Sequence, residues 1–267
     1  MASYNGTRLK GMDLSKRFSV IVDGLNITGE IYYPEASQKL HPALCICHGI
    51  PAAVPTPGDM GYPLLAEWFA KEGFITCIFN FRGCGESEGN LDLLHWTRDL
   101  DSVITYLSWL EGVDESRISL MGFSGGAAAS AYAAARDERI SALILCACPA
   151  KFSIGTLGRS PEEFLDQCRR VGTIRDSDFP PSIDKWANHF QQVSPLDCIK
   201  KISPRPLLII HGDKDQTIPP NHASRLYGMA KAPRKLIMVP GGEHRLRTNE
   251  MAMVSALAWL KQVNGLT

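Results

Sequence analysis

The sequence lacks an excess of charge of either sign. Among its 267 residues, 28 are lysine or arginine and 28 are aspartate or glutamate, so the formal net charge is zero. Proteins that bind the phosphate backbone of nucleic acid usually carry a clearly positive patch or balance. A nucleic-acid partner is therefore not expected.

Long apolar runs are also missing. No stretch reaches the roughly 18 apolar residues that a membrane-spanning helix needs. The opening segment, MASYNGTRLKGMDLSKRFSV, has no apolar run of the kind that a secretory signal requires. We therefore expect a cytoplasmic protein with no membrane span.

The eight cysteines do not form an evident disulfide or metal framework. Five of them lie in apolar, strand-like runs, namely Cys45, Cys47, Cys77, Cys146 and Cys148. Free thiols in such runs behave as small buried hydrophobic side chains. Apart from one histidine, the sequence near the two C-x-C pairs offers no further ligands to complete a tetrahedral zinc set. Reduced cysteines and no metal site are expected.

Apolar runs of strand length recur along the chain. Residues 17–33 form two β-rich runs separated by Asp23-Gly24, a dipeptide typical of a hairpin turn. Six further runs follow, at 42–47, 74–80, 117–123, 140–147, 206–212 and 235–240. The pattern predicts an antiparallel start followed by a buried, mostly parallel sheet, with eight strands in all.

Segments between these runs have helical spacing. The clearest is 95–110, where one apolar stripe is formed by Trp96, Leu100, Val103, Ile104, Leu107 and Leu110. Further helices are expected near 61–72, 125–136, 220–230 and 250–263. Alternating strands and helices predict a doubly wound α/β sheet, in which ligands bind at the carboxyl ends of the strands.

Residues 151–203 interrupt this alternation after the sixth expected strand. The interval is too long for a simple crossover, and aromatic residues such as Phe164 and Trp186 are not typical of a flexible linker. We predict a small helical cap inserted here, within a single domain that spans residues 1–267.

Ser124 is the candidate nucleophile. It lies in Gly122-Phe123-Ser124-Gly125-Gly126, between the expected strand 117–123 and an alanine-rich helix. A sharp strand-to-helix turn would expose the serine hydroxyl, and the flanking glycines would relieve crowding. G-x-S-x-G alone is a weak signal in a chain with 23 glycines, but this context favours a nucleophile over a structural turn.

The strand 42–47 leads into a loop suited to stabilising negative charge. Its sequence is His48-Gly49-Ile50-Pro51. One backbone amide of such a loop can pair with the amide of the residue after the nucleophile to bind an oxyanion. Because Pro51 has no amide hydrogen, Ile50 and Gly125 are the predicted pair. The alternative is an ordinary strand-to-loop turn, with His48 as a structural side chain.

The motifs HGIP, FNFRGCGESEG, GFSGG, HGDKDQTIP and GGEH, with their spacing, resemble those of the α/β-hydrolase superfamily. The resemblance covers nearly the whole chain. Within the superfamily, the chain is similar to small esterases, cinnamoyl-ester hydrolases, monoacylglycerol lipases and serine-aminopeptidase-like proteins. The resemblance implies an α/β-hydrolase fold and a catalytic triad in the chain order Ser, Asp, His.

Two carboxylates, Asp213 and Asp215, follow the strand 206–212, and only one can orient a catalytic imidazole. The family pattern, an acid three residues before an apolar-Pro pair, falls on Asp215. Asp213 is then expected to cap local amides. His244 follows the last strand through a glycine turn, where a base must reach Ser124; a neutral structural role is its alternative.

Residues 80–89, NFRGCGESEG, resemble a family loop that usually opens with Asp, which Asn80 replaces here. We call this segment the glycine-rich loop. Arg82 has the chemistry to position a substrate carboxylate, but we expect it to tie the loop to its neighbours. Cys84 has no assigned base and is not expected to be a nucleophile.

The predicted activity is hydrolysis of a carboxylic ester with a small or medium acyl group, without metal or organic cofactor. Peptidase, thioesterase and acyltransferase chemistry would use the same residues, and a ligand-binding protein without turnover is the rival of another class. The loop 51–63 and the insertion 151–203 are expected to border the pocket. Tyr62 and Trp186 are candidate pocket residues, with packing as the alternative for each.

Overall fold

The computed structural model describes residues 15–35, 39–51 and 61–266. Its strands form one eight-stranded sheet in the order β1-β2-β4-β3-β5-β6-β7-β8. The elements are β1 (Ser15–Val22), β2 (Leu25–Tyr32), β3 (His41–Cys47), β4 (Ile75–Phe79), β5 (Val113–Phe123), β6 (Ile140–Cys146), β7 (Leu207–Gly212) and β8 (Arg234–Val239). β2 is antiparallel to both β1 and β4, and the other neighbours are parallel, so the predicted sheet is confirmed.

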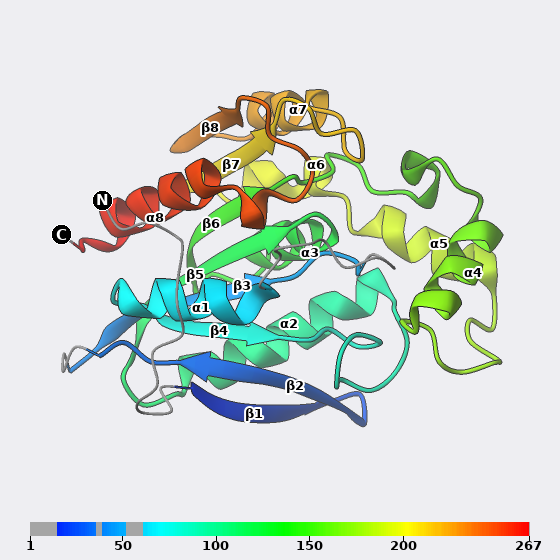
Figure 1. Cartoon of the computed structure of the whole chain (residues 1–267), viewed down its shortest axis with the longest axis horizontal. Helices are drawn as coiled ribbons and strands as arrows, with labels where there is room; N and C mark the ends of the chain where they lie inside the picture. Colours follow the sequence, from blue (N-terminus) through cyan, green and yellow to red (C-terminus); the bar gives the residue numbers. More distant parts are fainter. Residues whose placement is uncertain (1–14, 36–38, 52–60, 267) are drawn as a thin grey trace.

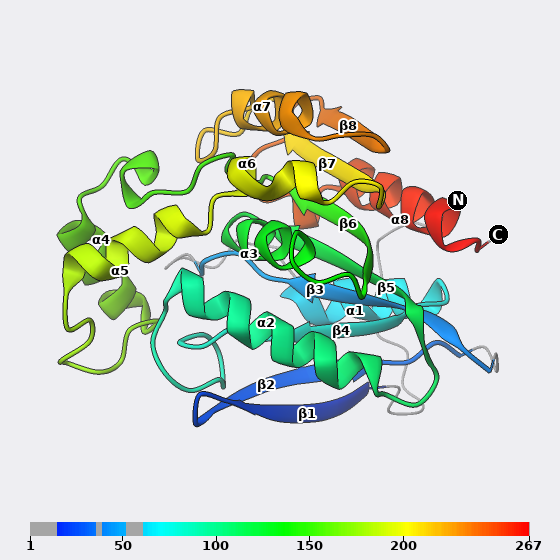
Figure 2. The same cartoon turned by 180° about the vertical axis from the view of Figure 1, so that it is seen from behind.

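Helices cover both faces of this sheet. α1 (Gly61–Lys71) and α8 (Glu250–Asn264) pack on one face, and α2 (Leu93–Ser108), α3 (Gly125–Ala134) and α7 (Asn221–Met229) on the other (Figure 1 and Figure 2). Each face has its own cluster of buried apolar side chains. Among the described helices, none has both the length and the apolar content that a bilayer crossing requires.

Two element boundaries differ from the sequence pattern for local reasons. β5 begins at Val113, four residues before the apolar run, because Val113 pairs with His41 at the start of β3. α2 begins at Leu93, since the Asp92 side chain accepts hydrogen bonds from the amides of Leu94 and His95 and caps the helix.

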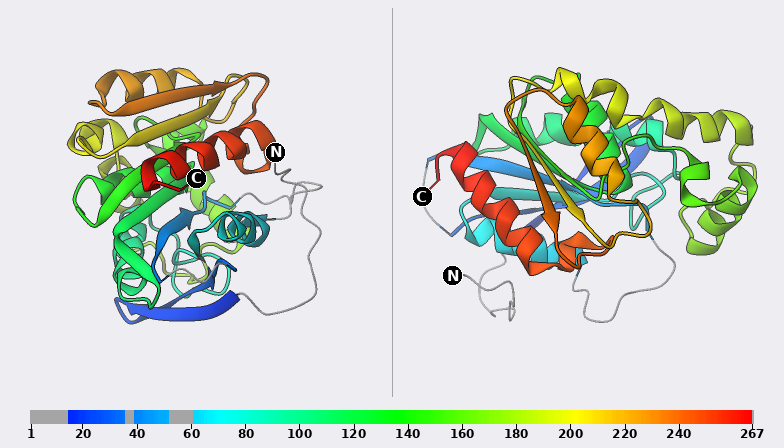
Figure 3. Two further views of the ribbon diagram at one scale, coloured as in Figure 1. Left: turned by 90° about the vertical axis from the view of Figure 1, so that its left-hand side faces the viewer. Right: turned by 90° about the horizontal axis from the view of Figure 1, so that it is seen from above.

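The insertion 151–203 is helical, as predicted. It contains η1 (Ile154–Leu157), α4 (Pro161–Val171), α5 (Ile183–Gln192), α6 (Pro195–Cys198) and η2 (Ile199–Lys201). α4 and α5 lie beyond the sheet at one end of the molecule (Figure 1 and Figure 3). Phe164 of α4 and both Trp186 and Phe190 of α5 form a packed aromatic cluster with Phe152, which precedes η1.

Candidate active site

Ser124 lies in a strained turn between β5 and α3. Its φ is +51°, a conformation that residues other than glycine rarely adopt. A β-carbon at Gly122 would come within 2.5 Å of the Ala127 Cα, and one at Gly126 would overlap the carbonyl oxygen of His48. The two flanking glycines are therefore needed for this tight turn, which places Ser124 at the carboxyl edge of the sheet.

Ser124, His244 and Asp215 are joined by two hydrogen bonds. His244 Nε2 lies 3.1 Å from Ser124 Oγ, and His244 Nδ1 lies 2.8 Å from Asp215 Oδ2. With its Nδ1 proton donated to the carboxylate, the imidazole presents Nε2 as an acceptor for the serine hydroxyl proton. The arrangement, built from the loops after β5, β7 and β8, is chemically able to activate a serine for nucleophilic attack.

Asp215 is held by more than its bond to His244. Its Oδ1 accepts hydrogen bonds from the amides of Thr217 (2.9 Å) and Ile218 (2.8 Å). The buried His211 places Nε2 3.3 Å from Asp215 Oδ2 and 2.8 Å from the Ile218 carbonyl oxygen. Burial opposes ionisation, but hydrogen bonds from His211, His244 and the Ile218 amide outweigh it and hold the pKa of Asp215 well below its usual range.

His211 is a site residue that the sequence analysis missed. The sequence feature that indicates its role is the four-residue spacing to Asp215, because the tight turn between the two residues brings their side chains together. Asp213, by contrast, accepts a hydrogen bond from the Gly241 amide at 2.7 Å, in keeping with its expected role as a loop carboxylate.

The loop after β3 is fixed by His48. The buried imidazole donates from Nδ1 to the Gly49 carbonyl oxygen (2.7 Å), and its Nε2 accepts from the Phe81 amide (3.1 Å). Burial lowers the pKa of His48 to about 4, so the ring is neutral near pH 7. This clamp sets Ile50 beside Gly125: a β-carbon on that glycine would lie 3.7 Å from the Ile50 nitrogen.

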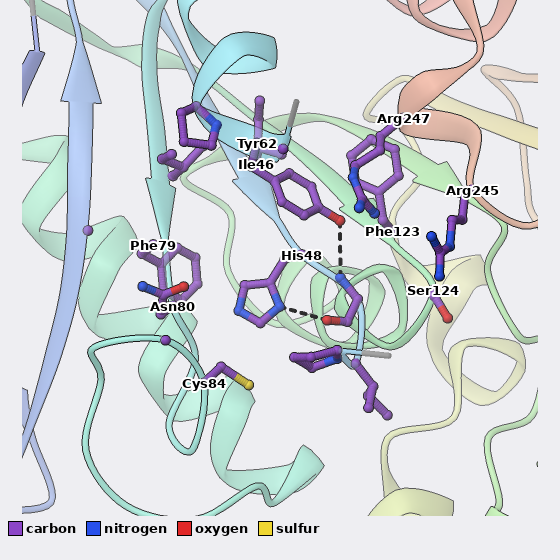
Figure 4. Close-up of a pocket in the computed structure, with 18 of the residues that line it drawn as sticks. Ile46, His48, Tyr62, Phe79, Asn80, Cys84, Phe123, Ser124, Arg245 and Arg247 are labelled. Atoms are coloured by element: carbon purple, nitrogen blue, oxygen red, sulfur yellow. Dashed lines mark hydrogen bonds between the residues drawn. The ribbon is translucent and has the colours of Figure 1, made fainter. Parts of the chain in front are cut away.

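Tyr62, at the start of α1, lies in the pocket wall (Figure 4). Its hydroxyl accepts a hydrogen bond from the Gly49 amide at 3.4 Å, and its ring packs edge-on to Phe123. The Arg247 guanidinium lies 4.9 Å from the centre of the same ring. Burial raises the pKa of Tyr62 to about 12, which keeps the hydroxyl protonated at neutral pH. The structure thus places Tyr62, a predicted pocket residue, in the wall of the cavity.

Ser124 and His244 open onto a cavity of about 560 Å³. Its other described lining residues include Glu30, Ile46, Ile78, Phe79, Asn80, Cys84, Gly85, Arg245, Leu246 and Arg247 (Figure 4). They come from β2, β3, β4, the glycine-rich loop, and η3 (Leu246–Thr248) with the residue before it, Arg245. None of these lining residues belongs to the insertion 151–203, so the expectation that it borders the pocket is not met by the described residues. Of the loop 51–63, residues 52–60 lie outside those described.

Trp186 does not line this pocket. Its side chain is buried, its Nε1 donates to the Leu91 carbonyl oxygen at 2.8 Å, and its ring stacks on Phe164. The indole serves as the packing centre of the insertion because α5 turns its apolar side toward α4 and the protein body. The packing alternative therefore describes Trp186 better than the pocket prediction.

Arg82 ties the glycine-rich loop to its surroundings, as expected. The buried guanidinium makes a two-pronged contact with Asp99 of α2, with bonds of 3.0 Å and 2.6 Å to Oδ1, and a further bond of 3.0 Å to Asp23. These partners hold the side chain between α2 and the β1–β2 turn. Arg82 is not among the described residues that line the pocket.

A second group of reactive side chains lies outside the pocket. Asp92, His95 and His189 each offer one potential ligand atom, and these atoms lie within 4.8 Å of one another. This is the group, within the described parts of the chain, whose spacing suits a metal ion. The sequence did not reveal it because 97 positions separate His189 from Asp92.

Comparison with known proteins identifies a shared family. Residues 42–180, just over half of the chain, match the model of the alpha/beta hydrolase fold family. An uncharacterized protein of Escherichia coli K12, YfhR, is 30% identical over 185 residues, which is 67% of this chain and 56% of that protein. The chain thus spans little more than half the length of this relative.

Two further proteins carry more descriptive names. The thiohydrolase aneE of Aspergillus aculeatus is 35% identical over 132 residues, covering 48% of this chain and 39% of that protein. The crystal structure of the alpha/beta hydrolase GrgF from a Penicillium species superposes with a TM-score of 0.73, covering 94% of this chain and 99% of that one at 19% identity. At this level of identity, the likeness to GrgF is a likeness of fold alone.

Proposed function

The chain belongs to the alpha/beta hydrolase fold family, and we propose that it is a serine hydrolase that cleaves a carboxylic ester through an acyl-enzyme on Ser124. One observation carries the proposal. The hydrogen-bonded chain from Ser124 through His244 to the buried Asp215 stands at the wall of an accessible cavity. A serine with only a structural role would not need the strained backbone conformation that Ser124 has at this cavity wall.

In the first step, His244 Nε2 takes the hydroxyl proton while Ser124 Oγ attacks the ester carbonyl carbon. Negative charge develops on the carbonyl oxygen, and the amides of Ile50 and Gly125 bind it. Asp215 stabilises the imidazolium that forms and keeps its proton on Nδ1. The imidazolium then protonates the departing alkoxide, which leaves as an alcohol.

In the second step, water attacks the acyl-enzyme with His244 as the base. The tetrahedral intermediate again places its oxyanion on the same two amides, and its collapse releases the acid and returns the proton to Ser124 Oγ. These steps require only side chains and amides of this chain.

The cavity supports a substrate of small or medium size. Its volume of about 560 Å³ lies in the range typical of small-molecule sites, roughly 300–1,000 Å³. Ile46, Ile78, Phe79 and Phe123 give it an apolar lining suited to an acyl group. Thioester cleavage is the second candidate, because a matched relative is named a thiohydrolase and both reactions pass through an acyl-enzyme.

A fluorophosphonate probe tests the nucleophile. Wild-type protein should be labelled with one equivalent, and Ser124→Ala should not be labelled while its circular dichroism spectrum stays unchanged. Ser108→Ala is the matched control, because Ser108 merely donates a hydrogen bond to the Thr105 carbonyl oxygen in α2. Unlabelled wild type, or labelling that survives in Ser124→Ala, would refute the assignment.

A substrate panel then separates the reaction types. Nitrophenyl esters of increasing acyl length are compared with matched acyl thioesters and aminoacyl anilides. We expect the highest kcat/KM for short or medium esters. A preference for thioesters at equal acyl length would favour the second candidate, and labelling without turnover of any substrate would favour a binding protein.

A further inference from the structure

Asp92, His95 and His189 form a compact cluster where the insertion meets α2. Asp92 caps the helix, His95 lies in its first turn, and His189 comes from α5. His95 Nδ1 lies 3.0 Å and His189 Nδ1 2.7 Å from the same atom, Asp92 Oδ2. Two imidazoles from different parts of the chain thus converge on one carboxylate oxygen.

The donor set and its spacing suit a transition-metal ion. Imidazole nitrogen and carboxylate oxygen bind zinc-type ions at about 2.0–2.2 Å. Two ligands at that distance, subtending about 90–110° at the ion, lie roughly 3–3.4 Å apart. The separations of 3.0 and 2.7 Å are therefore close to those of a loaded site, and a few tenths of an ångström of opening would admit the ion.

The surroundings preorganise the carboxylate. Asp92 is 4% exposed, and its other oxygen, Oδ1, accepts hydrogen bonds from the amides of Leu94 (3.1 Å) and His95 (3.2 Å). This leaves Oδ2 aimed at the imidazoles. Such outer-shell bonds hold the ligands of metal sites in place.

Solvent access to the cluster also suits a bound cation. The histidine side chains are 34% and 26% exposed, which leaves solvent access for water to complete the coordination. To coordinate an ion through Nδ1, each imidazole must carry its ring proton on Nε2.

We propose that Asp92, His95 and His189 bind one divalent zinc-type ion, which joins α5 of the insertion to the start of α2. A neighbouring hydrogen bond joins the same two parts of the chain, because Trp186 of α5 donates to the carbonyl oxygen of Leu91, next to Asp92. The ion would strengthen a docking surface that already exists. Its position on the insertion side makes its role structural rather than catalytic.

The test uses the full chain, stripped with a chelator and titrated with Zn²⁺ by calorimetry at pH 7.5. Wild type should bind one equivalent, and thermal unfolding should shift to a higher temperature with zinc. His189→Gln and His95→Gln should each weaken binding by more than the tenfold to hundredfold typical of outer-shell changes. Asp92→Asn keeps a helix-capping side chain while losing the charge, and should weaken it similarly.

His222→Gln is the matched control. The His222 imidazole accepts a hydrogen bond from the Ala150 amide and lies outside the cluster, so zinc binding should be unchanged. Substitution of Co²⁺ should give visible d–d absorption in wild type and lose it in His189→Gln. If wild type binds no Zn²⁺ below about 10 µM, or if the three variants bind as wild type does, the cluster is a hydrogen-bonded contact only and the proposal is wrong.

Discussion

The glycine-rich loop forms part of the pocket wall and is also contacted by the insertion, with different chemistry on the two sides. Asn80, Cys84 and Gly85 of the loop line the cavity. The insertion instead binds its backbone: the Arg175 guanidinium donates to the carbonyl oxygens of Gly85 and Ser87, both at 2.8 Å. One side of the loop therefore lines the cavity, whereas the insertion holds the loop in place through hydrogen bonds to its carbonyl oxygens.

The difference shows that an insertion after β6 need not supply the residues that line the pocket. Its large side chains pack in its own aromatic cluster or form hydrogen bonds to the protein body, such as that from Trp186 Nε1 to the Leu91 carbonyl oxygen at 2.8 Å. The lining comes instead from strand edges and from the turn after His244. Variants on the pocket side should thus alter catalysis or selectivity, and variants in the insertion should alter stability.

The largest effect is expected for Asp215→Asn on the pocket side. The neutral amide cannot stabilise the imidazolium or enforce its tautomer, so kcat for ester cleavage should fall by about 10⁴-fold with the fold intact. Asp213→Asn, which changes a loop carboxylate two residues away, should change kcat less than about twofold. Stopped-flow or steady-state assays of both variants decide between the carboxylates; an equal loss in the two would break the assignment.

Trp186→Ala tests the insertion side. Truncating a buried indole that packs on Phe164 and Phe190 should lower the free energy of unfolding by about 3–5 kcal/mol. The acyl-length preference of the remaining folded enzyme should stay the same, because Trp186 does not line the pocket. Trp109→Ala is the control, since Trp109 is 86% exposed, and urea unfolding gives both values. A changed acyl preference would show that the insertion shapes the pocket after all.

The pH dependence of the free energy of unfolding should reveal the buried imidazole of His48 in the pocket wall. The folded-state pKa of His48 is lowered from 6.5 to about 4, so below pH 6.5 the unfolded chain binds a proton that the folded protein does not. His48 should therefore reduce stability as the pH falls from 6.5 to 4, by roughly 3 kcal/mol. His48→Asn should remove this component from unfolding curves measured across that range; an identical pH profile in the variant would contradict it.

The smallest effect concerns selectivity. Ile78 lies in β4 and lines the cavity, so Ile78→Phe should fill part of the acyl space. The ratio of kcat/KM for long over short acyl esters should drop by about tenfold, the scale that one or two methylene groups are worth in an apolar pocket. Ile21→Phe, at a position 71% exposed in β1, is the control and should leave the ratio unaltered. An unchanged ratio in Ile78→Phe would place the acyl group elsewhere.

Much of the fold followed from local patterns. Strand-length apolar runs, the Asp23-Gly24 turn and the stripe that includes Trp96 and Leu100 predicted the sheet and its helices, because side-chain periodicity reflects which face is buried. Boundaries at Val113 and Leu93 were less predictable. They depend on a strand partner and on a capping bond, neither of which leaves a periodic signal.

The sequence by itself predicted Ser124 and His244 from short-range features, namely turns after strands and glycine-flanked motifs, and it predicted Asp215 over Asp213 from the family pattern that the chain resembles. Only the tertiary structure decided that Trp186 points into the insertion, that His211 supports Asp215, and that the pocket wall comes from strand edges. The physical reason is that side-chain packing joins residues far apart in the chain. Direction and distance between such residues are set by how whole helices and strands pack, which no local pattern records.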